Sequence, residues 1–190
     1  KDYMYSSLQD SYENWSASFL VKVGQPLGQF FGYMYDGVYT TDDFIQNADG
    51  SYTLKPGIPY DSNRRREDVK PGDMKFVPQT DSVDADGNPT YALSTDKDKA
   101  VVGNANPVFS GGFTNNLSYK GFDLSVFMSF SLGNKVWNLN KVRYYGPYLG
   151  NMNSFSEMGG RFTLIDPATG KETTDLARLA ELNPRQHDKD

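Results

Sequence analysis

The chain has 190 residues, with 19 basic and 24 acidic side chains and a formal net charge of −5 at pH 7. This acidic balance argues against general nucleic-acid binding, and no apolar run is long enough for a transmembrane helix. The absence of cysteine excludes disulfides and thiolate chemistry, and the single histidine, His187, argues against a histidine-based triad or zinc site. Because the chain starts with neither Met nor a signal segment, we expect residue 1 not to be a natural start.

Aromatic residues make up 14% of the chain, with 13 Tyr and 12 Phe, beside 18 Gly and 10 Pro. Aromatic side chains favour strands, whereas glycine and proline mark turns. The aromatic content also argues against disorder, because disordered chains are poor in aromatics. The composition therefore predicts an all-β chain with long loops.

The first predicted element covers residues 15–23, where Trp15, Phe19 and Val21 alternate with polar neighbours, as in a strand with one buried face. Residues 24–107 differ: glycines space out a run of aromatics, and a long polar stretch follows. That stretch carries turn signals, and a hairpin is predicted around Asp49-Gly50. A loop of this length is rare in a compact domain unless it is functional.

Residues 108–132 carry the clearest pattern. Apolar residues hold the odd positions of 109–119 and the even positions of 122–132, with mostly Ser, Thr, Asn and Gly between them. This pattern predicts two strands of about ten residues joined by a three-residue turn, which is the length and alternation of an outer-membrane barrel strand. The apolar face would then meet lipid, the polar face a wet lumen, and Tyr119 and Phe122 an interface.

A soluble secreted β-sandwich that binds carbohydrate is the alternative, because its strands alternate in the same way. The short turn between two very long connections favours the barrel, whose turns are short on the periplasmic side and whose loops are long outside the cell. Residues 133–190 are less regular. We predict a short strand at 161–165, a turn at 166–170 and helical turns at 174–182.

Three segments resemble the SusC/RagA-type TonB-dependent outer-membrane transporters of Bacteroidetes, in the order that the family has them. GQPLGQFFGY at 24–33 runs into YDGVY at 35–39, KPGDMKF follows at 70–76, and VGNANPVF at 102–109 leads into GGFTNNLSYKGFDLS at 111–125. The segment DSVDADG at 81–87 departs from the D-x-N-x-D-G element that the family often has there.

The resemblance implies a fragment of the C-terminal barrel region, within an all-β transmembrane barrel that has 22 strands in plugged outer-membrane transporters. Residues 24–107 would form a long extracellular loop region, 108–132 a transmembrane hairpin, and 133–190 further extracellular loop and strand segments. The whole protein would import an oligosaccharide or peptide across the bacterial outer membrane. Its partners would be a SusD-like surface lipoprotein, outer-membrane lipid, and TonB through a part not in this chain. No catalysis is expected.

The aromatic run supplies the candidate residues for substrate or partner contact, because tyrosine combines a ring with a polar group. The alternative, which we favour, is local packing that ties a long loop to the barrel rim. The five candidates are Phe30, Phe31, Tyr33, Tyr35 and Tyr39.

Aspartates in the polar stretch are candidate calcium ligands, because hard cations prefer several oxygen ligands. However, Ser82 stands where a calcium-binding helix–loop–helix needs its first acid, and Leu93 stands where it needs Glu. We therefore expect a solvated acidic loop and no cofactor, with a weak calcium site as the alternative. The residues Arg64, Arg65 and Arg66 are read as a solvated turn, with phosphate or lipopolysaccharide contact as the alternative. The five aspartates are Asp81, Asp84, Asp86, Asp96 and Asp98.

Overall fold

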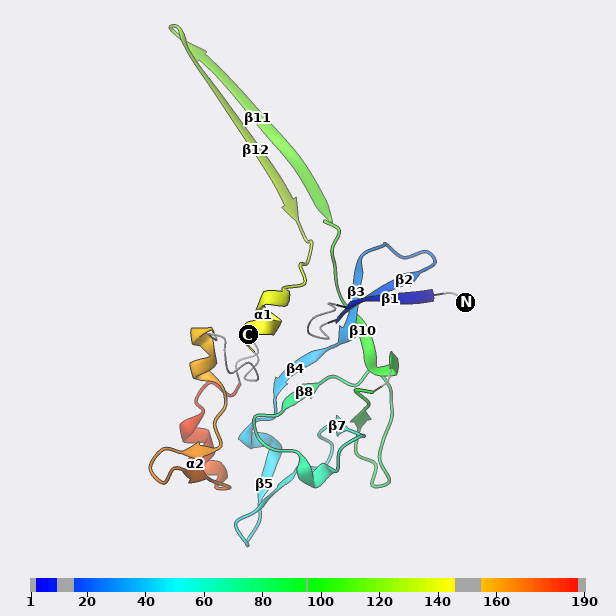
Figure 1. Cartoon of the computed structure of the whole chain (residues 1–190), viewed down its shortest axis with the longest axis vertical. Coiled ribbons are helices and arrows are strands. Elements are labelled where there is room, and N and C mark those ends of the chain that lie inside the picture. The colour runs from blue at the N-terminus through cyan, green and yellow to red at the C-terminus, as the bar shows by residue number, and fades with distance from the viewer. Residues whose placement is uncertain (1–2, 10–15, 95, 146–154, 188–190) are drawn as a thin grey trace. The chain divides into compact units, whose positions relative to one another are not determined.

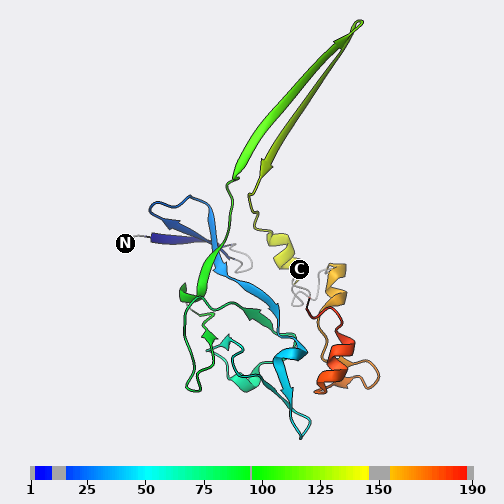
Figure 2. The same cartoon turned by 180° about the vertical axis from the view of Figure 1, so that it is seen from behind.

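A computed structural model describes residues 3–9, 16–94, 96–145 and 155–187 (Figures 1 and 2). The chain divides into two compact units, which are treated separately below. Unit 1 comprises Lys1–Gly32 and Val101–Leu139, and unit 2 comprises Tyr33–Ala100 and Asn140–Asp190. The described elements are mostly strands, so the all-β fold class is confirmed. None of the helices in the described ranges is long and apolar enough to cross a membrane.

Unit 1 contains a four-stranded sheet in the order β1-β2-β3-β10. Its strands are β1 (Tyr3–Gln9), β2 (Ser16–Lys22), β3 (Gln29–Tyr33) and β10 (Lys99–Asn104). The strand predicted at 15–23 is confirmed as β2, which runs antiparallel to both β1 and β3. Phe30 anchors the sheet, because its ring lies 5.3 Å from that of Phe19 and 6.0 Å from that of Trp137.

Strands β11 (Phe109–Tyr119) and β12 (Phe122–Leu132) form the long antiparallel hairpin at the top of Figure 1. The predicted strand pair is confirmed, but its turn has two residues instead of three. Lys120 has φ 47° and Gly121 has φ 86°, as a type I′ turn requires of both central residues. Tyr119, which the sequence prediction included in the turn, is the last residue of β11 and pairs with Phe122 next to the turn.

Unit 2 is built from short strand pairs rather than from an unstructured loop. Sequence-distant segments form two of them: β4 (Tyr35–Val38) with β8 (Met74–Phe76), and β7 (Tyr60–Asp61), parallel, with β9 (Thr90–Tyr91). The hairpin predicted around Asp49-Gly50 is confirmed as β5 (Phe44–Gln46) with β6 (Tyr52–Leu54). The 3-10 helices η1 (Thr41–Asp43) and η2 (Arg66–Asp68) lie between these strands, and η3 (Asp96–Asp98) follows β9.

In the described residues that follow, helix α1 (Leu139–Tyr144) begins with the last residue of unit 1 and continues in unit 2. Unit 2 then contains 3-10 helix η4 (Ser156–Gly160), the pair β13 (Ile165–Asp166) with β14 (Lys171–Glu172), and helix α2 (Leu176–Leu182). The predicted strand at 161–165 is wrong, because only Ile165 of that range is in a strand. The turn at 166–170 and the helical turns at 174–182 are confirmed. The Asp175 carboxylate caps α2 by accepting from the backbone N–H groups of Ala177 and Arg178.

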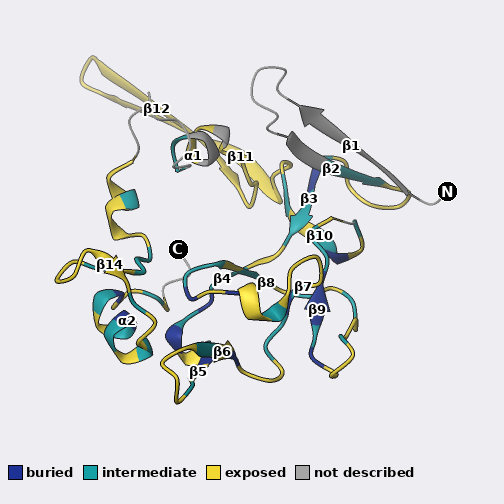
Figure 3. Cartoon of the chain, turned by 60° about the horizontal axis from the view of Figure 1, so that its bottom comes forward, coloured by how far each residue is buried: buried dark blue, intermediate teal, exposed yellow. Residues whose placement is uncertain are grey.

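The apolar core of unit 2 lies among β5, β6, β7 and the segment just after β4 (Figure 3). Tyr39 and Phe44 are almost fully buried, and their rings pack edge to face at 6.3 Å. Ring edges carry positive charge and ring faces negative charge, so this arrangement is attractive. The core residues are Tyr39, Phe44, Leu54, Tyr60 and Val69, with Tyr52, Ile58 and Leu176 packed around them.

Candidate functional site

The hairpin β11–β12 has two chemically different faces. Its register pairs odd residues of β11 with even residues of β12, so the apolar positions of both strands share one face. Their side chains are exposed, with 55% of Leu117 and 56% of Leu124 accessible. Asn115 is the polar exception on this face, and Phe127 is the apolar exception on the opposite face. The apolar face comprises Phe109, Phe113, Leu117, Tyr119, Phe122, Leu124, Val126, Met128, Phe130 and Leu132.

Two glycines of β11 make room for aromatic rings of β12. A Cβ on Gly111 would lie 2.7 Å from the Phe130 ring, and one on Gly112 would lie 3.3 Å from the Phe127 ring. Each ring therefore lies over glycine backbone, in the space that a Cβ atom of any other residue would fill. Glycine allows this close approach. The polar face is also ordered across the strands, since the Ser125 hydroxyl lies 2.6 Å from Asn116 Oδ1.

The length of the hairpin matches a bilayer. Eleven residues per strand at about 3.4 Å each span about 37 Å, or about 26 Å along the membrane normal at a tilt of about 45°. An outer-membrane barrel has an apolar band about 25 Å tall. A soluble sandwich would instead need a second sheet over the apolar face, and within the described residues every position of β11 and β12 is exposed.

The open end of the hairpin is joined to the sheet by two of the sequence motifs. Ala105 donates its backbone N–H to the Gly28 carbonyl at 2.8 Å, and Asn106 donates its side-chain amide to the Leu27 carbonyl. Gly28 has φ +81°, which favours glycine at this contact. The segment after β12 also binds here, because the Lys135 backbone N–H donates to the Asn104 carbonyl at 2.7 Å.

A second motif pair is joined inside unit 2. Tyr39 exchanges backbone hydrogen bonds with the turn at 70–73: its carbonyl accepts from Gly72 at 2.8 Å and its N–H donates to Asp73 at 2.9 Å. Gly72 has φ +88°, and a Cβ there would lie 2.6 Å from the Phe162 ring. Glycine is thus required twice at this position, by its backbone conformation and by its neighbour.

The five aromatic candidates occupy different environments. Phe30 and Tyr39 are buried, at 6% and 2% exposure, and they pack within units 1 and 2 respectively. The Tyr39 hydroxyl donates to the Pro59 carbonyl and lies 3.0 Å from that of Tyr91. Phe31 and Tyr33 are partly buried, and the Tyr33 hydroxyl donates to the Leu93 carbonyl. Half of Tyr35 is exposed, so it is the candidate best placed for outside contact.

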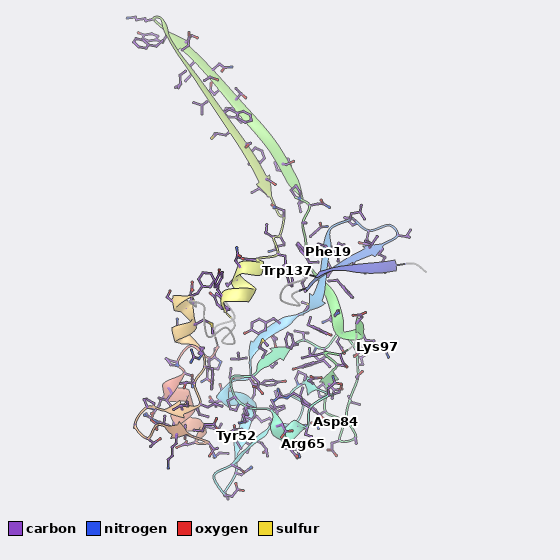
Figure 4. All side chains as sticks on the ribbon, viewed as in Figure 1. Phe19, Tyr52, Arg65, Asp84, Lys97 and Trp137 are labelled. Carbon is purple, nitrogen blue, oxygen red and sulfur yellow. The ribbon has the colours of Figure 1, made fainter. Side chains whose placement is uncertain are left out.

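Among the acidic candidates, the Asp84 carboxylate organises a turn (Figure 4). It accepts from the backbone N–H groups of Asn88 and Asp86 at 2.8 and 2.9 Å and from the Tyr60 hydroxyl at 3.0 Å. Hydrogen bonds from Asn88, above all from its backbone, and those from Tyr60 and Asp86 lower the pKa of Asp84 to about 2. Its oxygens therefore order the loop around residues 84–88.

The Asp98 carboxylate likewise accepts hydrogen bonds from backbone N–H groups, those of Gln79 and Ala92. It is buried, which alone would raise its pKa, but bonds from Ala92, Gln79 and Thr80 outweigh burial and lower the pKa. Asp96 pairs with Lys99 at 2.6 Å, while Asp81 and Asp86 are exposed. The described residues contain no group of three or more His, Asp or Glu side chains placed to hold a metal ion.

The arginine run is tied into unit 2. Arg64 pairs with Asp73 at 3.0 Å, Arg65 pairs with Asp68 at 2.8 Å, and Arg66 donates to the Leu54 and Lys55 carbonyls. Arg66 also lies over the Tyr60 ring. The prediction of a solvated turn therefore fits Arg65, whose side chain is 72% exposed. Arg66 instead packs on Tyr60, a residue of the core.

Sequence reasoning missed the ion pair between Lys75 and Asp43, whose Nζ and Oδ2 atoms lie 3.3 Å apart. Both side chains are largely shielded, at 16% and 13% exposure, and Asp43 also forms the capping box of η1 with Thr40. The pair joins β8 to η1 across 32 residues of sequence. No periodic signal marks it, because Lys75 lies within one strand of only three residues and Asp43 directly precedes another.

Comparison with known proteins gives partial matches to three curated receptors of Formosa agariphila. TonB-dependent receptor P3 is 31% identical over 63% of this chain, receptor P39 is 25% identical over 68%, and receptor P26 is 36% identical over 49%. These matches support the TonB-dependent receptor family. The chain spans about a tenth of the length of the TonB-dependent receptors it matches, with 10%, 13% and 9% of each covered. No protein-family model matches the chain.

Proposed function

We propose that this chain is the C-terminal barrel portion of a SusC/RagA-type TonB-dependent transporter in the bacterial outer membrane. The observation that carries the proposal is the hairpin β11–β12, whose exposed apolar face and length fit a barrel wall. The names of the similar proteins and the ordered motifs support the same assignment. The whole transporter would import an oligosaccharide or peptide, and this portion has a structural and binding role without catalysis.

In this proposal residues 108–132 cross the membrane. The apolar face meets outer-membrane lipid, and the face with Ser110, Asn116 and Ser125 lines the lumen. Phe109 lies opposite Leu132, so the chain before β11 and the chain after β12 leave the hairpin at the same end. Residues 24–107 and 133–190 therefore lie on one side, which we assign to the cell exterior because the opposite end is a two-residue turn.

The extracellular segments would contact the substrate and a SusD-like surface lipoprotein, while TonB would bind a part of the protein outside this chain. Tyr35 is the proposed contact residue among the five aromatic candidates, because half of its side chain is exposed. Its ring packs edge to face on that of Phe76, with centroids 6.3 Å apart, and this contact helps to fix the orientation of the Tyr35 ring.

The test is fractionation of cells that express the full-length gene product, combined with surface proteolysis of intact cells. We expect the product in the outer membrane, with cleavage between residues 40 and 100 on intact cells. Cleavage should also occur within 155–187. A product released without detergent would refute the proposal, and cleavage only after the outer membrane is opened would reverse the orientation.

A further inference from the structure

Two stretches of chain that the hairpin separates in sequence fold together in unit 2. The first is the loop body, residues 33–100, and the second is the strap, residues 155–187. In both views the strap, orange to red, lies beside the cyan segment that contains η1 and β5 (Figures 1 and 2). Helix α2 of the strap contacts η1 directly.

Specific hydrogen bonds join the two. The Gln186 side-chain oxygen accepts from both the backbone N–H and the hydroxyl of Thr41, at 2.8 and 3.1 Å. Near β5, Gln46 Oε1 accepts from the backbone N–H of Leu176 at 2.9 Å. A side chain of the strap therefore accepts from a backbone N–H of the loop body, and a side chain of the loop body accepts from a backbone N–H of the strap. Polar groups buried inside one folded unit are paired in this way.

Apolar contacts reinforce the junction at two points. Leu176, the first residue of α2, packs against the core cluster of the loop body. The Phe162 ring lies over Gly72 so closely that a Cβ there would meet it at 2.6 Å. The strap therefore completes the core, whose burial stabilises the loop body.

We propose that the strap clamps the loop body, so that the two extracellular loops flanking β11–β12 form one body and move together. This inference rests on the proposed function, which places both loops outside the cell. The consequence is coupling: a substrate or partner that displaces one loop displaces the other. Packed side chains and hydrogen bonds between the two loops are the physical contacts through which such coupling is carried.

Hydrogen–deuterium exchange on the purified full-length receptor tests the clamp. Leu176→Ser removes the apolar anchor, and Ile165→Ser is the matched control, since Ile165 is 53% exposed on the same strap. We expect Leu176→Ser to speed exchange in residues 41–54 about tenfold or more, and Ile165→Ser to leave it unchanged. Faster exchange confined to residues 155–187 would overturn the proposal, because the strap would then be an appendage.

Crosslinking tests the contact in the unaltered receptor, whatever the variants do to folding. Lys70 Nζ and Glu172 Oε2 lie 4.0 Å apart, with side chains 50% and 66% exposed, so a water-soluble carbodiimide should join them as an amide. The Lys99–Asp96 pair at 2.6 Å is the control for the reaction. The proposal would be overturned if the carbodiimide joined Lys99 to Asp96 but did not join Lys70 to Glu172.

Joint movement is tested by a permanent bridge. Lys70→Cys with Glu172→Cys, in a receptor in which any cysteine outside this chain is replaced by serine, can be linked by a short bis-maleimide. The bridge should leave substrate uptake unchanged, because the loops already move as one. Loss of uptake on bridging would overturn the proposal. Exchange and crosslinking are read on purified protein, whereas a failed assignment as a transporter appears in cell fractionation, so the two failures are distinguishable.

Discussion

If β11–β12 crosses the outer membrane as proposed, replacing Val126 with Arg tests which face of the hairpin meets lipid and how deep Val126 lies. Val126 belongs to the fifth of the eleven cross-strand pairs counted from the turn. At about 3.4 Å per residue and a tilt of about 45°, it stands about 11 Å above the turn, near the middle of an apolar band about 25 Å tall. Arginine at the midplane of a lipid face costs about 2–4 kcal/mol.

The assay compares folded receptor in outer membranes by its heat-dependent gel mobility, for matched variants. Leu132→Arg shares the apolar face but lies in the eleventh pair, where the cost falls to about 0–1 kcal/mol. Ser125→Arg lies beside Val126 on the polar face and should cost less than Val126→Arg. Equal folding of Val126→Arg and Ser125→Arg would refute the lipid assignment, and a greater loss for Ser125→Arg would show that the faces are reversed.

Three further predictions concern the turns. Gly72→Ala should destabilise unit 2 by about 1–3 kcal/mol, because its Cβ would collide with the Phe162 ring and its φ is positive. Faster proteolysis of residues 33–100 would measure this loss. Gly57→Ala is the control and should have a smaller effect, because its Cβ would meet nothing within 4 Å. Lys120→Val should weaken the hairpin, because β-branched residues disfavour its φ of 47°, whereas Lys120→Gly should be tolerated; equal amounts of folded receptor for the two would contradict the type I′ assignment. Asp84 has a folded-state pKa of about 2, below its ordinary value near 3.9, so its stabilisation of the loop is present above pH 4 and is lost as the pH falls toward 2. The protection factors of the amides in residues 84–91, which correct for the pH dependence of intrinsic exchange, should therefore fall over that range in the native protein and not in Asp84→Asn.

The sequence predicted the hairpin because its alternation continues over eleven residues in each strand. The predicted turn was one residue too long, because an alternation with period two does not show at which residue the cross-strand pairing stops. The β5–β6 hairpin was also predictable, because Asp49-Gly50 marks its turn. Asp84 lies in a turn between strands, but no pattern in the sequence indicates its hydrogen bond from Tyr60 or the burial of Asp98.

The architecture of unit 2 could not be read from the sequence. Its strands have two to four residues, too few for a periodic signal, and its stabilising contacts are remote in sequence. Thr41 and Gln186, for example, lie 145 positions apart. For the same reason the aromatic run could not be divided by pattern alone into buried Phe30 and Tyr39 and half-exposed Tyr35.

The pairing of β3 with β10 has a consequence for how the sequence between these two strands can vary. Because these strands are hydrogen-bonded neighbours, the chain leaves the sheet and returns to it at adjacent points. Residues 34–98 are thus inserted in the manner of a domain placed within a host, where close ends let the guest vary without disturbing the frame. We therefore expect residues 34–98 to be exchangeable between related chains that share this sheet, provided that the inserted segment brings a matching strap or a core that needs no strap.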